Sequence, residues 1–135
     1  MSQDRLKSMQ RIVAVQAQRK RLAEWKVAEI EGRKHACATA RIELGTYMEE
    51  ANLAGPLAGL ALKQARRLAE RAAQTETELQ LQRAAVQAAE RRHRLAERIT
   101  ETVEVEHRAL QERRSLERLI ESAMARAQQH GPDTA

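Results

Sequence analysis

The sequence predicts an all-α protein in which two long, unequal helices form an antiparallel coiled-coil hairpin. Composition is the first reason, because 42% of the residues are hydrophobic and 32% are charged, yet the chain has one Trp, one Tyr and no Phe. This composition is typical of long helices and lacks the aromatic side chains of a thick globular core. The other two reasons are the clustering of most Gly and Pro residues and a heptad repeat of apolar residues.

The first helix is expected over about residues 4–51. Alternate steps of three and four residues give a mostly apolar series, interrupted by Gln16, Lys20, Lys34 and Arg41. The series is Leu6, Met9, Val13, Gln16, Lys20, Ala23, Val27, Ile30, Lys34, Cys37, Arg41, Leu44, Met48 and Ala51. A 3,4 repeat of this length favours a coiled coil over an ordinary surface helix.

A turn is expected at about residues 52–56. Asn52 suits the left-handed position after a helix end, Gly55 suits an N-cap, and Pro56 suits the first helical position, where its missing N–H costs nothing. A connection this short makes the two helices antiparallel neighbours. The alternative is a single kinked helix in a parallel dimer.

The second helix is expected over about residues 57–129, followed by a disordered tail at 130–135. One heptad position persists through it, at Leu68, Thr75, Gln82, Ala89, Ala96, Val103, Leu110, Glu117 and Met124. The second apolar position of each heptad lies four residues after this one early in the helix, at Ala72, Leu79, Val86 and His93. Later it lies four residues before it, at Ile99 and Ile120. This change predicts a stripe that drifts around the helix, as a period of 3.6 against 3.5 residues allows.

Pairing the helices about residue 54 places Ile30 opposite Leu79 and Met9 opposite Ile99. In this pairing the N-terminal end of the first helix lies opposite Val103. About twenty-five residues of the second helix, or about 37 Å, then have no partner within the chain. This overhang carries Leu110, Leu116, Leu119, Ile120 and Met124. An unpartnered apolar stripe indicates a binding surface; fraying of the helix or self-association are the alternatives.

We expect no catalytic, cofactor-binding or metal-binding site. The four His residues are spread over both helices without ligand spacing, and the Gly55–Gly59 segment lacks the Lys-Ser/Thr ending of a phosphate loop. Cys37 occupies a heptad core position, where we expect inert burial, and a single cysteine suits a reducing cytoplasm. No apolar run is long enough to span a membrane, and the first residues lack the order of a secretory signal.

The net charge of +5 raises the question of nucleic acid binding. Basic residues gather near the start, at Arg5, Lys7 and Arg11, but acidic residues are interleaved with basic ones elsewhere. Aromatic platforms and groove-reading motifs are missing from the sequence. We therefore expect no specific nucleic acid partner, and expect the basic start to meet an acidic protein surface.

The chain resembles the family of the flagellar export protein FliJ and its injectisome relatives of the YscO type. The resemblance covers nearly the whole chain and is carried most by two segments, Leu44-Gly45-Thr46-Tyr47-Met48-Glu49-Glu50 and Glu112-Arg113-Arg114-Ser115-Leu116-Glu117-Arg118. The first is similar to the family's Leu-x-x-Tyr segment before its turn, and the second to its charged closing helix. The family has a second tyrosine where this chain has Ala51, and an early aromatic in the second helix for which Leu60 is the nearest replacement.

The resemblance implies a non-enzymatic stalk of a type III protein export apparatus, flagellar or injectisome. Its implied partners are the export ATPase ring, the membrane export gate protein and export chaperones, at a cytoplasmic location peripheral to the inner membrane through these partners. It assigns gate contact to Leu44, Tyr47 and Leu60 near the turn. We expect ATPase contact at the open end, through Arg5, Lys7, Arg11, Leu116, Arg118, Ile120 and Met124. The alternative function is a homodimeric coiled-coil scaffold or chaperone.

Overall fold

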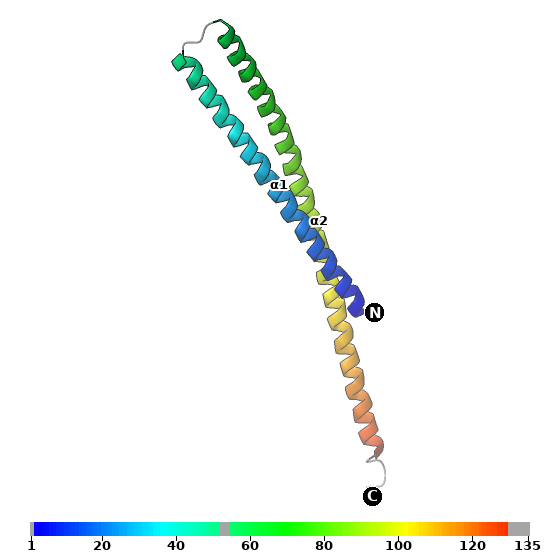
Figure 1. The fold of residues 1–135 in the computed structure, drawn as a ribbon. Helices are drawn as coiled ribbons and strands as arrows, with labels where there is room; N and C mark the ends of the chain where they lie inside the picture. Colours follow the sequence, from blue (N-terminus) through cyan, green and yellow to red (C-terminus); the bar gives the residue numbers. More distant parts are fainter. Residues whose placement is uncertain (1, 52–54, 130–135) are drawn as a thin grey trace. The chain divides into compact units, whose positions relative to one another are not determined.

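The computed structural model describes residues 2–51 and 55–129, nearly all of which are helical (Figure 1). Helix α1 spans Ser2–Ala51 and helix α2 spans Pro56–Gln129. The two helices contact each other, so the predicted all-α class with two long, unequal helices is confirmed. Residues 52–54 of the predicted turn and the predicted tail at 130–135 lie outside the described residues.

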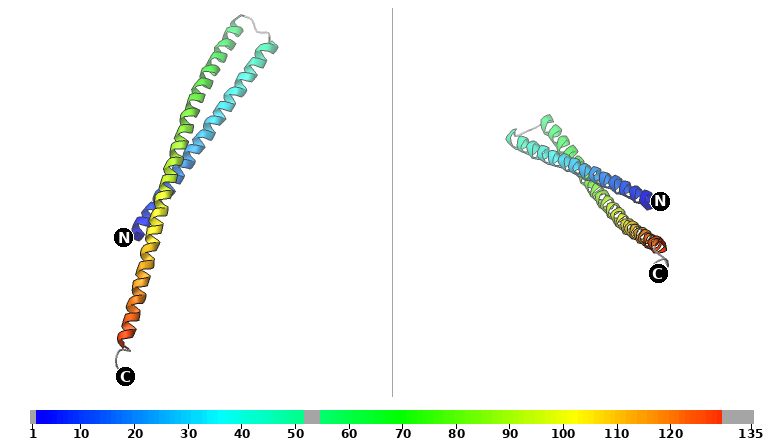
Figure 2. Two further views of the ribbon diagram at one scale, coloured as in Figure 1. Left: turned by 180° about the vertical axis from the view of Figure 1, so that it is seen from behind. Right: turned by 90° about the horizontal axis from the view of Figure 1, so that it is seen from below.

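The helices contribute to two compact units. The turn unit comprises Gln16–His93, and the terminal unit comprises residues 1–15 together with 94–135. Each unit therefore contains one stretch of α1 and one stretch of α2, which Figure 2 shows from two further sides.

In the turn unit, α1 and α2 pack as an antiparallel hairpin. Contacts show the direction, because Glu31 pairs with Arg83, Lys34 pairs with Glu76, and Cys37 contacts Leu68, so residue numbers rise on one helix as they fall on the other. Buried residues between the helices follow steps of three and four on α2 and include Ile30, Cys37, Ala61, Leu68, Thr75, Leu79 and Ala89. Two of them are Ala, whose small side chain lets two helix axes approach closely.

The sequence places three positions of α1 incorrectly in this interface. Lys34, Arg41 and Ala51 are exposed, and Ala40 is half-buried beside the predicted Arg41. For Lys34 and Arg41 the physical reason is the cost of burying charge without a partner, whereas Ala51 is the last residue of α1. Lys34 instead directs its ammonium outward to the Glu76 carboxylate at 2.8 Å, where both groups keep contact with water.

Three polar side chains at the helix interface donate hydrogen bonds to main-chain carbonyls. The buried hydroxyl of Thr75 donates to the carbonyl of Arg71 at 2.8 Å, and that of Thr100 donates to the carbonyl of Ala96 at 2.7 Å. Gln82 donates from Nε2 to the carbonyl of Ala23 across the helices at 3.3 Å. A buried hydroxyl or amide bonded in this way avoids most of its desolvation cost.

Helix α2 starts as predicted. The carbonyl of Gly55 accepts a hydrogen bond from the N–H of Gly59 at 3.3 Å, as an N-cap carbonyl does, and Pro56 is the first helical residue. Gly55 has φ of 68°, a left-handed conformation that side chains bearing Cβ rarely adopt. The glycine is therefore required by the backbone, since nothing described lies within 4 Å of where its Cβ would be.

In the terminal unit, the first turns of α1 lie against the middle of α2. Leu6, Met9 and Val13 are half-buried on α1, while α2 buries Ala96, Thr100 and Val103 and half-buries His107 and Leu110. The predicted drift of the stripe is wrong, because α2 keeps its 3,4 spacing from Ala61 to Leu110. Ile99, predicted to face Met9, is 41% exposed, and Thr100 occupies the buried position instead.

Among the described residues, neither helix contains a stretch apolar enough to cross a membrane.

Candidate partner-binding surfaces

The last part of α2, residues 111–129, is helical and exposed at every position. The heptad that faces α1 has its last partly buried residue at Leu110, and the positions that would continue it are Arg114, Glu117, Glu121 and Met124. The three positions that follow Leu110 in this stripe are therefore charged, and Met124 is its one large apolar member beyond Leu110. We call residues 111–129 the C-terminal segment.

Four large apolar residues of the C-terminal segment are open to solvent: Leu116, Leu119, Ile120 and Met124. Three of them were predicted as ATPase contacts, namely Leu116, Ile120 and Met124. The spacing 116, 119, 120 and 124 puts these side chains on one helical face. Arg118, also predicted there, lies two residues from Leu116 and so projects from a different side of the helix. An exposed apolar face on a helix that is otherwise charged is a candidate protein-binding surface.

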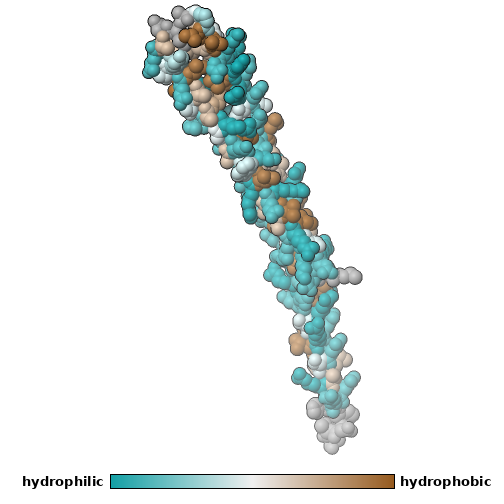
Figure 3. Space-filling model, viewed as in Figure 1, coloured by the Kyte–Doolittle hydropathy of each residue, from teal (hydrophilic) through white to brown (hydrophobic). Residues whose placement is uncertain are grey.

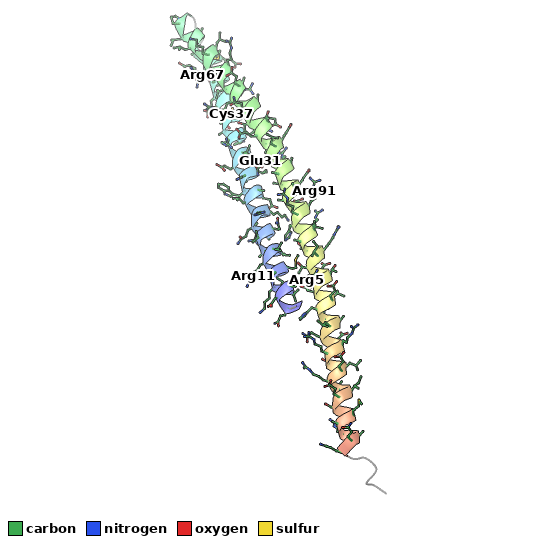
Figure 4. All side chains as sticks on the ribbon, turned by 90° about the vertical axis from the view of Figure 1, so that its right-hand side faces the viewer. Arg5, Arg11, Glu31, Cys37, Arg67 and Arg91 are labelled. Atoms are coloured by element: carbon green, nitrogen blue, oxygen red, sulfur yellow. The ribbon has the colours of Figure 1, made fainter. Side chains whose placement is uncertain are left out.

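The predicted basic group on α1 is only partly brought together. Arg5, which Figure 4 labels on α1, pairs with Glu106 of α2 at 3.8 Å and helps to line a shallow groove with Ala109 and Arg113. Lys7 and Arg11 are exposed and each lies two residues from Met9, so both project away from the contact of Met9 with α2. Neither forms an ion pair with any residue that the structure describes. They remain available to an acidic partner, separately from the groove.

The predicted gate-contact residues are divided between two environments. Leu44 is half-buried and lines a groove with Met48, Ala65 and Leu68 between the helices of the turn unit. Tyr47 and Leu60 are 57% and 62% exposed and do not line this groove. Leu44 therefore supports the helix interface, whereas Tyr47 and Leu60 are the members of the set that a partner could reach.

Two residues beside the turn escaped the sequence prediction. Leu57 and Leu62 are exposed large apolar residues in the first turns of α2, near Leu60. Figure 3 shows hydrophobic residues gathered in this region of the turn unit. The signal that could have found them is the run Leu57-Ala58-Gly59-Leu60-Ala61-Leu62, in which only Ala61 lies at a buried heptad position.

The described residues contain no group of His, Cys, Asp and Glu that could hold a metal ion. Cys37 is buried, as predicted, and its thiol donates to the carbonyl of Leu68 at 3.3 Å. His93 and His107 are half-buried at the helix interface, where each has an interaction partner.

Comparisons with protein-family models, curated proteins and solved structures gave no match to this chain.

Proposed function

We propose that this protein is a non-enzymatic adaptor that binds other proteins through exposed surfaces of its two helices. The observation that carries the proposal is the C-terminal segment, which extends past the residues packed on α1 and exposes Leu116, Leu119, Ile120 and Met124. Burial of such side chains by a partner is favourable by roughly 25 cal/mol per Å² of apolar surface.

The proposed partner of the C-terminal segment is the ring of a type III export ATPase, as the resemblance implies. Lys7 and Arg11 support this choice, because cations without a partner among the described residues steer association with an acidic surface. The proposed role is that of a stalk that couples the ATPase to the export gate and to export chaperones.

The proposed gate contact uses the exposed residues near the turn. Tyr47 and Leu60 are retained from the prediction, and Leu57 and Leu62 are added because they are exposed beside them. Leu44 is retained as a support, since its side chain is partly buried between α1 and α2.

The test is the ATPase rate of a purified type III export ATPase from the same organism, measured with and without this protein. The wild type is expected to stimulate the rate. Leu116→Ser with Ile120→Ser should reduce the stimulation at least tenfold at limiting protein, whereas Tyr47→Ala with Leu60→Ala should leave it unchanged and weaken binding to the gate protein.

Circular dichroism of each variant provides the control for helical structure. Equal stimulation by the wild type and the Leu116→Ser/Ile120→Ser variant contradicts the assignment of the C-terminal segment. Absence of any stimulation or binding by the wild type contradicts the export role itself.

A further inference from the structure

Helix α2 carries a second heptad stripe in the terminal unit, one residue before each position that packs on α1. Leu95 precedes the buried Ala96, Ile99 precedes the buried Thr100, and Ala109 precedes the half-buried Leu110. The same 3,4 spacing continues through Leu116 and Ile120 to Ala123 and Ala127. A shift of one residue is a rotation of about 100° around the helix, so the second stripe is a separate face next to the first.

We define the second stripe as the members of this repeat between residues 95 and 127. At the equivalent positions earlier in α2, Leu81, Ala85 and Ala88 are apolar but are separated from the stripe by Arg92, and the positions from Gln64 to Glu78 are polar. The residues of the stripe are all exposed, among them Leu95, Ile99, Leu116 and Ile120. A regular heptad over thirty-three positions (95 to 127) is typical of a helix that packs on a further helix.

Thr102 and two charged residues interrupt the stripe, and the charged residues have opposite signs. Glu106 and Arg113 lie three residues before and four residues after Ala109. They flank the shallow groove, which is also lined by Val103, Ala109 and Leu110. The Arg5–Glu106 pair is 3.8 Å long with both side chains more than half exposed, so it leaves the carboxylate open to a second cation.

We propose that the second stripe binds a second copy of this chain, with the two α2 helices antiparallel and the two-fold axis close to Ala109. In this arrangement Glu106 of each copy lies within one helical turn of Arg113 of the other, because the two residues are nearly symmetric about the axis. Leu95 and Ile99 of each copy then reach the part of the other helix that carries Ile120 and Ala123. The stripe is thus complementary to itself in both charge and apolar character.

Charge selects this orientation against the parallel one. A parallel dimer in register would place Glu106 against Glu106 and Arg113 against Arg113, and like charges in contact are unfavourable. The inference does not depend on the identity of the partner proposed above. Because Leu116 and Ile120 belong to both surfaces, self-association and partner binding compete for the C-terminal segment.

The test is the dimer dissociation constant of the full chain, measured by sedimentation equilibrium. The wild type is expected to dimerise, and Arg113→Glu should weaken the dimer at least tenfold, as should Glu106→Arg. The double variant Glu106→Arg/Arg113→Glu should restore it, and an equimolar mixture of the two single variants should form a heterodimer. The matched control is Arg108→Glu, which reverses an exposed arginine outside both stripes.

Orientation is tested with Ala109→Cys and Ala123→Cys and a short bis-maleimide cross-linker, the wild type with its buried Cys37 serving as control. Ala109→Cys should cross-link between copies, whereas Ala123→Cys should not, since its two copies are more than about 35 Å apart in the antiparallel dimer. Efficient cross-linking of both variants, a monomeric wild type, or a dimer insensitive to Arg113→Glu overturns the proposal. A charge-dependent dimer that does not bind an export ATPase supports this inference while contradicting the proposed function.

Discussion

Replacing Gln16 by Leu should stabilise the protein. Gln16 is half-buried on the face of α1 that packs on α2, and its Oε1 atom is buried without a hydrogen-bond partner among the described residues. An unsatisfied buried polar atom costs about 1–3 kcal/mol, and Leu removes that atom while filling a similar volume. Allowing for imperfect packing of the new side chain, the free energy of unfolding should rise by about 1–2 kcal/mol, or the Tm by roughly 3–8 °C.

Two further substitutions make this prediction specific. Gln82 also lies at the interface, but its Nε2 donates to the Ala23 carbonyl. Because Gln82→Leu loses this hydrogen bond, it should raise the free energy of unfolding by less than Gln16→Leu does. Gln18 is exposed, and Gln18→Leu should change stability by no more than about 0.5 kcal/mol. Urea unfolding followed by circular dichroism gives all three values. A Gln16→Leu variant no more stable than Gln18→Leu would refute the reasoning from the orphaned amide oxygen.

The remaining predictions concern the turn, a cross-helix ion pair and the helix interface. Gly55→Ala should lower the free energy of unfolding by about 1–2 kcal/mol, because alanine must adopt φ of 68°, and urea unfolding measures the loss. The hydrogen bond and charge of Lys34 hold the pKa of Glu76 below its ordinary value, so Lys34→Gln should raise that pKa in an NMR titration. Because the pKa of Glu76 is lowered in the folded protein, the small stabilisation from this pair is present above the unfolded pKa and is lost as pH falls through the folded pKa. An unchanged Glu76 pKa in Lys34→Gln would contradict the contact. Thr100→Val keeps the shape of a buried side chain whose hydroxyl donates to a carbonyl of its own helix. The melting temperature of this variant should therefore stay within a few degrees of that of the wild type, and a much larger fall would show that the hydroxyl has another role.

The heptad on α1 was predictable because apolar residues at steps of three and four have one physical explanation, burial against another helix. Ile30 and Cys37 are buried as the pattern indicates, and the start of α2 at Pro56 follows from local backbone chemistry. Lys34 and Arg41 were misplaced because spacing alone takes no account of long side chains that carry their charge out to solvent.

The errors on α2 have a different origin. Hydrophobicity favours Ile99 over Thr100 as the buried residue, yet the heptad period selects Thr100, whose hydroxyl is satisfied by the Ala96 carbonyl. Ile99 and Ile120 belong to the second stripe, so a helix with two apolar faces was interpreted as one face that drifts. The partners of the exposed residues could not be derived from the pattern, because periodicity reports that a face is apolar and not what covers it.

Hydrogen–deuterium exchange of the full chain, alone and with a type III export ATPase, tests the central claim most directly. The claim is that the C-terminal segment, exposed throughout in the structure, is the surface that a protein partner covers. Binding should slow amide exchange at residues 111–129 at least several-fold and leave residues 57–62 unchanged. An ATPase complex that forms without slowing exchange at residues 111–129 would contradict the account.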